Sequence, residues 1–371
     1  MPTATLTYRE AIRQAIIEEM DRDRQVFCMG EDIGRYKGTF RVTDGLYEKY
    51  CIEPNDWLVN PPHPELKDGI GRRIIDTPIT EPAIVGFATG AAMVGLRPIV
   101  EMMTMSFSIL ALDQIINHTA KVHYMTGGQI TVPLVIRGPG GAANQLSAQH
   151  SHSMEGWYAH VPGLKVVAPA FPADAKGMLK TAVRDDNPVI FTENPGLYTV
   201  KGEVDDDPNY LVPFGKANVV RPGTDLSLVA YSRMVHVCLK AAEILARDGI
   251  EAEVVDVRSL LPLDTDTIYQ SVRKTHRAVV VYEDWRSGGF GAEIAARIGE
   301  DCFDDLDAPV GRVGGLNVPM PYSRVLELQC IPNENDVVAA VRKFDWQSWR
   351  SSQNQTLRRP SAPPSPHPSP S

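Results

Sequence analysis

Short apolar runs alternate with helical patterns over the first half of the chain, and this alternation constrains the fold more than any other feature. Ile12, Ile16 and Met20 recur every four residues, which places them on one face of the first expected helix. Strands separated by helices of this length require parallel crossovers. The pattern therefore predicts an α/β domain with a parallel sheet flanked by helices. The expected strands are 26–29, 99–101, 132–136, 165–168 and 189–192, and the expected helices are 8–22, 82–94, 108–125 and 173–184.

A segment of Pro, Gly and acidic residues interrupts the alternation at 194–209, and we expect it to be an interdomain linker. A chain of 371 residues is too long for one typical core, so we predict a first domain at 1–193 and a second α/β domain at 210–344. Within the first domain, the Pro-rich stretch 51–71 is expected to be a surface excursion. The Pro/Ser-rich tail, 345–371, cannot build a core and is expected to be disordered. In the second domain we expect strands at 225–230, 251–256 and 278–282 and helices at 234–248 and 291–302.

The charge and the cysteines narrow the class of protein. A net charge of -9 argues against nucleic acid or an anionic membrane as a partner. No apolar run approaches the roughly 20 residues that span a bilayer, and the first residues do not have the pattern of a targeting segment. The five cysteines are scattered without metal-site spacing, which is typical of free thiols in a reducing compartment. We therefore predict a cytoplasmic protein.

One carboxylate stands out in an apolar stretch. Glu81 is the only charged residue in ITEPAIVGFATGAAMVG (79–95), directly before Pro82 at the start of an expected helix rich in Gly and Ala. Such a residue is often a helix-terminal acid, which the helix dipole favours by about 0.3–1 kcal/mol. Alternatively, a partly buried carboxylate acts in proton transfer. The spacing alone does not decide between these roles.

Two further patterns suggest ligands only weakly. His150 and His152 alternate as two metal ligands on one strand face would, but no third ligand follows at suitable spacing. Residues 138–143 fit a dinucleotide-binding GxGxxA, yet the acidic residue that this motif needs about twenty positions later is missing. Neither a metal pair nor nicotinamide binding is favoured.

Many motifs, in order, resemble one known family over most of the chain. The chain is similar to the beta subunit of the thiamine-diphosphate-dependent decarboxylating component of 2-oxo acid dehydrogenase complexes, and most similar to that of pyruvate dehydrogenase. The resemblance implies two transketolase-like domains, a pyrimidine-binding domain followed by a C-terminal-like α/β domain. The motifs that carry it are GEDIG (30–34), RIIDTPITE (73–81), GAAMVGLRPIVE (90–101), RGPGG (137–141), AQHS (148–151), PGLKVVAP (162–169), RDDNPV (184–189), DAPVGRV and VPMPY.

The resemblance also implies a set of site residues. Glu81 would hydrogen-bond N1′ of the cofactor's aminopyrimidine ring and so help to activate the thiazolium carbon. Phe107 and Ile79 would contact the cofactor. His150, in AQHS, would assist proton transfer during acyl transfer to the lipoyl group, since histidine titrates near the required pH. A structural potassium ion would be bound, largely through backbone carbonyls, at Leu134, Ala182, Val183, Asp185 and Asn187.

An absent motif points to a partner subunit. Single-chain thiamine enzymes carry a Gly-Asp-Gly motif for magnesium and the diphosphate, and these 371 residues contain none. The resemblance therefore implies an alpha subunit that holds the magnesium, in a two-alpha, two-beta heterotetramer. The substrate would be a small 2-oxo acid, and a lipoyl-bearing acyltransferase would take the acyl group. Pyruvate is the first expectation; a branched-chain 2-oxo acid or acetoin dehydrogenase, or a non-catalytic scaffold subunit, are the alternatives.

Overall fold

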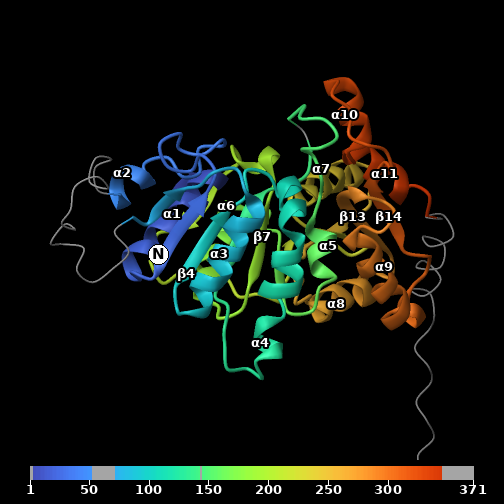
Figure 1. The fold of residues 1–371 in the computed structure, drawn as a ribbon. Helices are drawn as coiled ribbons and strands as arrows, with labels where there is room; N and C mark the ends of the chain where they lie inside the picture. The colour runs from blue at the N-terminus through green and yellow to red at the C-terminus, as the bar shows by residue number, and fades with distance from the viewer. Residues whose placement is uncertain (1–2, 52–71, 143, 345–371) are drawn as a thin grey trace, which may run out of the picture.

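The computed structural model describes residues 3–51, 72–142 and 144–344. These residues form two α/β units, coloured blue to green and yellow to red in Figure 1. Apart from Cys51, the expected excursion at 51–71 lies outside the described residues, as does the expected tail at 345–371. Cys51, the first residue of the excursion, and Arg72, which follows it, form an isolated antiparallel bridge.

The first sheet is parallel except at one edge. Within the described residues its order is β12-β6-β7-β5-β4-β2-β3, and β12 is the only antiparallel member. β12 follows the first domain in sequence, so the second half of the chain completes the first sheet. The strands are β2 (Val26–Gly30), β3 (Ile74–Asp76), β4 (Arg97–Glu101), β5 (Val135–Pro139), β6 (Lys165–Val167), β7 (Val189–Glu193) and β12 (Ser259–Leu261).

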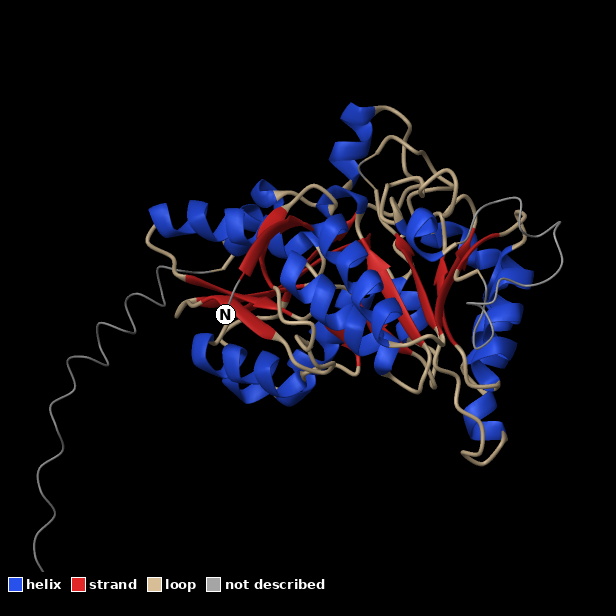
Figure 2. Ribbon diagram, turned by 90° about the vertical axis from the view of Figure 1, so that its left-hand side faces the viewer, coloured by secondary structure: helices blue, strands red, loops and turns tan. Residues whose placement is uncertain are grey.

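Helices cover both faces of this sheet, as expected for parallel crossovers (Figure 2). On one face α1 (Tyr8–Arg22) packs against α6 (Pro172–Arg184), and its buried residues include the predicted stripe of Ile12, Ile16 and Met20. A capping box formed by Thr7 and Glu10 starts α1. The other face is covered by α3 (Glu81–Met93). A short helix, α2 (Leu46–Tyr50), follows the β2 loop.

The single helix predicted at 108–125 was wrong. The chain instead forms the 3₁₀ helix η2 (Met105–Ala111), the π-helix η3 (Gln114–Thr119) and the short α4 (Val122–Met125). The Thr119 hydroxyl donates to the Gln114 carbonyl at 2.8 Å and shares a 2.6 Å hydrogen bond with Thr89 of α3. The Ala120 amide accordingly reaches back five residues to Ile115. Contacts with α3 thus favour the wider helical turn, which periodicity cannot reveal.

The segment expected as a linker, 194–209, contains regular structure. η4 (Pro195–Leu197) is followed by β8 (Lys201–Asp205), which pairs antiparallel with β1 (Thr3–Thr7). The segment therefore packs on the first domain before the chain enters the second. Its acidic residues continue beyond this pairing.

The second sheet is also mainly parallel. Within the described residues its order is β14-β13-β10-β11-β9, with β9 antiparallel. Its strands are β9 (Asn218–Arg221), β10 (Leu226–Ala230), β11 (Ala252–Asp256), β13 (Ala278–Trp285) and β14 (Gly311–Gly315). Its helices are α7 (Arg233–Arg247), α8 (Thr265–Thr275), α9 (Phe290–Asp301), α10 (Arg324–Cys330) and α11 (Glu334–Val341), with the 3₁₀ turn η5 (Phe303–Asp305). α10 projects at the top of Figure 1.

In the part of the chain that the structure describes, no helix has both the length and the apolar character needed to cross a membrane.

Candidate active site at the carboxyl edge of the first sheet

Polar residues gather where the parallel strands of the first sheet end. β2 runs into Glu31, β4 ends at Glu101, and β7 ends at Glu193. The loop after β3 is tied to the same edge, because the Thr77 amide donates to the Gly30 carbonyl at 3.0 Å. In open α/β sheets the ligand lies beyond the carboxyl ends of the strands. The fold therefore places the candidate site at this edge.

Glu81 is a buried carboxylate in the first turn of α3. It is 4% exposed, follows Thr80 as the N-cap and precedes Pro82. The Ile84 amide donates to the Thr80 carbonyl at 3.0 Å, and the helix starts at Glu81, one residue before the expected start at Pro82. A surface cap would leave its carboxylate in water, whereas this carboxylate is buried at the edge where ligands bind.

Glu31, within the GEDIG motif, is a second buried acid, and it was not among the expected site residues. One of its carboxylate oxygens, Oε1, is buried and has no hydrogen-bond partner. Burial raises the pKa of Glu31, and the charge of Glu81 raises it further, so the two carboxyl groups lie within electrostatic reach. An acid directly after a buried parallel strand was the available signal. An unpartnered acceptor beside Glu81 fits a ligand that carries N–H groups.

A buried arginine organises the strand ends beneath the site. Arg137 of β5 forms ion pairs with Glu101 of β4 and Glu193 of β7, and its Nη2 donates to Glu193 Oε2 at 2.8 Å. The Tyr198 hydroxyl donates to the same Glu193 oxygen at 2.7 Å. All of these charges have partners, so we assign this cluster to holding three strand ends in register.

The structure brings Phe107 and His150 together. Their rings lie 5.0 Å apart between centroids, edge to face, at an interplanar angle of 77°. Phe107 belongs to η2, which packs against α3, the helix that carries Glu81. Two predicted site residues that are far apart in sequence therefore share one contact.

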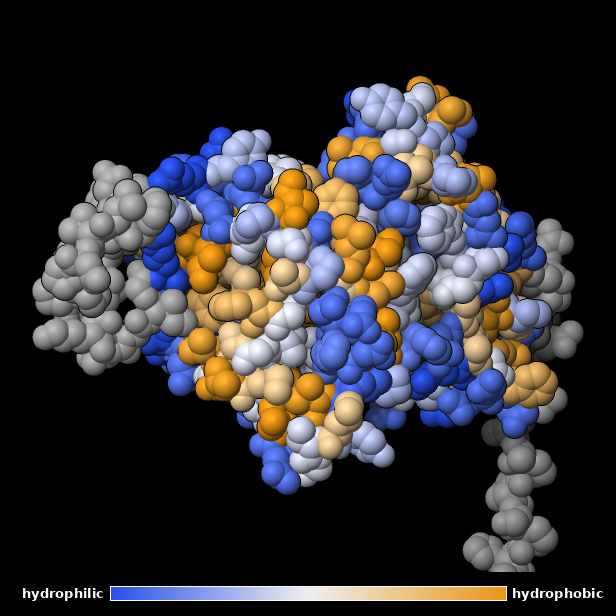
Figure 3. Space-filling model, in the orientation of Figure 1, coloured by the Kyte–Doolittle hydropathy of each residue, from blue (hydrophilic) through white to orange (hydrophobic). Residues whose placement is uncertain are grey.

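The face around α3 is apolar and open in the isolated chain. Ile79, in the loop before α3, is 83% exposed, and Phe87 on α3 is 62% exposed. Figure 3 shows hydrophobic residues over the front, where α3 lies in Figure 1. Large exposed apolar side chains that are neighbours on one face mark a contact surface. Other exposed apolar residues of α3 and η2 are Met93, Ile109 and Leu110.

The five positions expected to bind potassium gather at the amino ends of β5 and β7. The Val189 amide donates to the Leu134 carbonyl at 2.9 Å, and Arg97 Nη1 donates to the carbonyls of Val183 and Asp185 at 3.0 and 3.2 Å. The Ala182 carbonyl, in the last turn of α6, accepts from the Asp185 amide. Because a carbonyl oxygen can accept twice, these bonds leave capacity for an ion.

The side chains of this cluster are arranged around Asp185. Its Oδ1 accepts from the Asn187 amide and side chain, both at 2.9 Å, and Lys165 pairs with its other oxygen. Partial burial acts to raise the pKa of Asp185, but the donors Lys165 and Asn187 outweigh it, so the pKa is lowered. The carboxylate is thus held in its charged form.

His150 and His152 do not form a metal pair here. His152 lies edge to face on Trp285 of the second domain, with 5.8 Å between ring centroids, whereas His150 faces Phe107. Burial lowers the pKa of His152, and His150 lowers it further. Among the residues described, no group of three or more His, Cys, Asp or Glu side chains is arranged to hold a metal ion.

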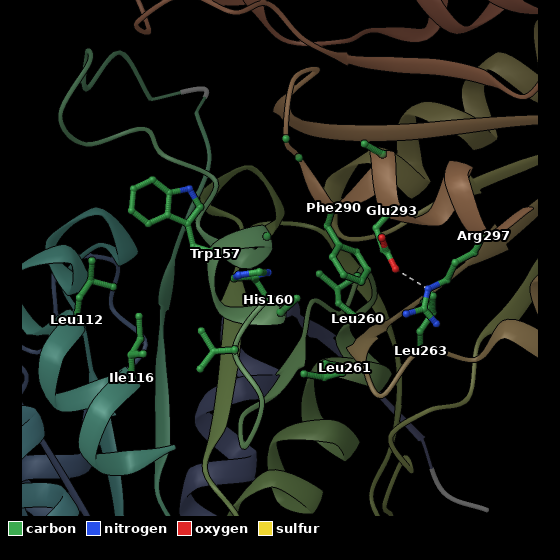
Figure 4. Close-up of a pocket in the computed structure, with 16 residues that line it drawn as sticks. Leu112, Ile116, Trp157, His160, Leu260, Leu261, Leu263, Phe290, Glu293 and Arg297 are labelled. Carbon is green, nitrogen blue, oxygen red and sulfur yellow. Dashed lines mark hydrogen bonds and ion pairs between the residues drawn. The ribbon is translucent and has the colours of Figure 1, made fainter. Parts of the chain in front are cut away.

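A groove of about 910 Å³ lies between the domains, away from these residues. Figure 4 shows Leu112, Ile116, Trp157 and His160 from the first domain facing Phe290 and the Glu293–Arg297 ion pair of α9. No predicted site residue is among its described lining residues. The candidate site residues therefore lie at the strand ends of the first sheet and not in this groove.

Comparison with known proteins defines the class of protein. Residues 4–201 match the transketolase pyrimidine-binding domain, and residues 215–337 match the transketolase C-terminal domain. A solved structure titled a split-gene transketolase, inactive beta4 tetramer, superposes with a TM-score of 0.72, covering 91% of this chain and 98% of that one. Its 24% identity supports the fold alone. The chain is an α/β protein with two transketolase-like domains, as the sequence predicted.

Curated relatives narrow the family further. A mitochondrial pyruvate dehydrogenase E1 component subunit beta from Dictyostelium discoideum is 46% identical over 344 residues, 92% of this chain and 91% of the relative. The Drosophila melanogaster mitochondrial protein of that name is 48% identical, over 91% of this chain and 88% of its own. The Rickettsia felis subunit beta is 47% identical, over 92% and 99%. The chain belongs to the family of pyruvate dehydrogenase E1 beta subunits, which are thiamine-diphosphate-dependent.

Proposed function

We propose that this chain is the beta subunit of a pyruvate dehydrogenase (acetyl-transferring), an oxidoreductase acting on 2-oxo acids that works only with an alpha subunit. The observation that carries the proposal is the 46–48% identity to E1 beta subunits over more than 90% of the chain. The burial of Glu81 at the carboxyl edge of the first sheet supports the proposal. The reaction would be the decarboxylation of pyruvate, with acetyl transfer to the lipoyl group of an acyltransferase.

Thiamine diphosphate fits the residues present. When bound, its thiazolium ring accepts the electron pair released as carbon dioxide leaves the 2-oxo acid. Glu81 would share a proton with N1′ of the aminopyrimidine, and the unpartnered Oε1 of Glu31 offers a second acceptor beside it. Phe107 and Ile79 would supply apolar contacts to the cofactor. His150 would move a proton during acetyl transfer. Its ring contact with Phe107, which would itself contact the cofactor, supports this role.

The alpha subunit would complete the site in a two-alpha, two-beta heterotetramer. The exposed apolar residues around α3, with Ile79 and Phe87 foremost, supply a surface for such a partner. The partner would hold the magnesium and the diphosphate, and the missing Gly-Asp-Gly motif supports this. A structural potassium ion at the Leu134–Asn187 cluster and a cytoplasmic location, supported by five free cysteines, are part of the same proposal.

Reconstitution with the alpha subunit tests the function. The isolated chain and the co-expressed pair are assayed for thiamine-diphosphate-dependent dye reduction with pyruvate and, separately, with 2-oxoisovalerate and acetoin. We expect activity only from the pair and a kcat/KM for pyruvate at least tenfold above that for the other substrates. Activity of the isolated chain would contradict the split site. Preference for another substrate would favour the branched-chain or acetoin enzyme, and an inactive but assembled pair would favour a scaffold.

A further inference from the structure

The loop that carries His150 is closed at its base against the first domain. It begins after β5 at Gly140 and leads to α5 (Glu155–Ala159). The Gly141 amide donates to the His152 carbonyl at 2.8 Å, which joins the two sides of the loop. The His152 amide donates to the Ser106 hydroxyl of η2 at 3.2 Å. The base of the loop is thus fastened next to Phe107, the aromatic partner of His150.

Two carboxylates of the second domain hold the outer part of the same loop. Glu283 of β13 accepts from the Ala142 amide at 2.7 Å and from Asn194 Nδ2 at 2.9 Å. Glu327 of α10 is almost fully buried, and both of its oxygens accept from the Gln145 amide, at 3.0 and 3.2 Å. Charge-assisted bonds of this kind are stronger than neutral ones. The second domain therefore binds the loop through two backbone amides, those of Ala142 and Gln145.

The two carboxylates share one neighbourhood. Burial raises the pKa of Glu283 against the opposing effects of Arg233 and of its two donors, and the charge of Glu327 raises it further. Placing two acids this close is unfavourable unless the donors they hold compensate. The arrangement is consistent with a requirement for both acceptors at the loop.

The backbone of the loop needs such support. Gln145 and Ser147 have φ angles of 55° and 65°, in the left-handed region that is unfavourable for residues with a side chain. Gly141 has a φ of 82°, and an added Cβ there would collide with the Glu283 carboxylate. Backbone in such unfavourable conformations persists only where contacts with the surrounding structure hold it in place. Gln145, one of these residues, is the one that Glu327 holds.

We propose that Glu327 and Glu283 are positioning residues that hold the His150 loop, so that the second domain governs acetyl transfer rather than decarboxylation. The proposal rests on the function proposed above for His150. Both carboxylates act through the backbone of the loop, and Gln145 lies five residues before His150. Decarboxylation would depend on Glu81, which lies on a different element, α3.

The test uses the assembled heterotetramer and separates two activities. Glu327→Met keeps the volume but removes both acceptors, while Glu327→Gln retains one acceptor oxygen. Glu253→Met is the matched control, because Glu253 is a buried acid of the same domain that pairs with Lys274. We measure reductive acetylation of an isolated lipoyl domain and pyruvate-dependent dye reduction. Glu327→Met should lower the kcat of acetylation about tenfold or more and leave dye reduction within about twofold, as expected for a misplaced catalytic group.

Further variants of Glu327 and Glu283 distinguish a general structural defect from a loss of loop positioning. Glu327→Gln should restore acetylation to within about threefold of the unaltered protein, and Glu253→Met should change neither activity. Glu283→Gln loses the bond from Asn194 but keeps an acceptor for Ala142. It should lower the kcat of acetylation less than Glu327→Met does, and it should likewise leave dye reduction nearly unchanged. It serves as the deciding variant if Glu327→Met fails to assemble.

Amide hydrogen exchange of the peptide spanning residues 140–152 reports on the loop itself. Exchange should accelerate in Glu327→Met and stay unchanged in Glu253→Met. Unchanged exchange, or faster exchange with unaltered acetylation, would overturn the proposal. His150→Ala tests the underlying function separately. If it leaves acetylation intact, the role of His150 fails, and the Glu327→Met result still decides whether the loop positions the transfer step.

Discussion

Helices α3 and α7 each cover a parallel sheet, yet they distribute polar and apolar residues in opposite ways. On α7 the exposed positions are charged, as at Lys240 and Glu243, and most of the apolar residues are buried. On α3 the charged Glu81 is buried, while Phe87 is exposed. Val94, directly after the helix, is exposed as well. A water-facing helix follows the first pattern. The comparison teaches that α7 has the polarity of a helix that faces water, whereas α3 has the polarity of a helix at a contact surface.

Replacing the buried acid of α3 should have the largest effect. Glu81→Gln removes the group that would share a proton with the cofactor, and we expect kcat for pyruvate-dependent dye reduction to fall about 100-fold or more. Assembly with the alpha subunit, followed by gel filtration, should be unchanged. The control is Asp266→Asn, an exposed acid in the first turn of α8, which should retain full activity. A fully active Glu81→Gln enzyme would reduce Glu81 to a helix-terminal charge.

Placing a charge on the outer face of α3 should disrupt assembly. Phe87→Asp inserts a carboxylate into the exposed apolar surface, and binding of the alpha subunit should weaken about tenfold or more, because hot-spot aromatics contribute above 1 kcal/mol. Circular dichroism of the isolated chain should be unaltered. Lys240→Asp on α7 is the matched change and should leave the heterotetramer intact. Equal binding by both variants would remove the distinction drawn between the two helices.

A smaller effect is expected at the contact between the domains. Glu155 of α5 is buried, and burial together with the charge of Asp284 on β13 raises its pKa from the usual 4.5 to about 8. The unfolded chain ionises this group above pH 4.5, whereas the folded chain keeps it neutral until about pH 8. Stability is therefore lost as pH rises through this range and is constant above it.

Glu155→Gln should remove this pH dependence. We expect the apparent Tm, at fixed protein concentration, to rise clearly at pH 8 and much less at pH 5, because the free-energy difference accumulates as pH rises from 4.5 towards 8. Glu300→Gln, an exposed acid of α9, is the control and should be silent at both pH values. A gain of equal size at pH 5 would show that packing, rather than the buried charge, is responsible.

The sequence predicts elements best where one local signal suffices. The stripe of Ile12, Ile16 and Met20 places α1 at its observed bounds, and a proline in the first turn marks the start of both α3 and α6. The strands β1, β8, β9 and β14 were not expected, because their pairing is set by distant segments rather than by apolar runs of their own. The π-helix η3 likewise depends on a hydroxyl of α3.

The site residues divide in the same way, into those that a local signal in the sequence reveals and those that only the fold brings together. Glu81 can be selected from the sequence because a lone charge in an apolar stretch is a local anomaly. The contact between Phe107 and His150 joins residues on separate loops, and the tether from Glu327 to Gln145 spans 182 positions. Spacing along the chain carries no information about such pairs. Resemblance to a family supplies candidate roles, and the geometry supplies the neighbours.

The two domains are not separable modules, because β12 belongs to the second in sequence and to the first in space. It pairs with β6 through Ser259–Val167 and Leu261–Val166. A gene fragment ending near residue 209 would encode every helix of the first core but would leave β6 as a bare edge, open to pairing with other chains. A first-domain fragment cut at the apparent boundary would therefore need β12 (Ser259–Leu261) to close the edge of its sheet.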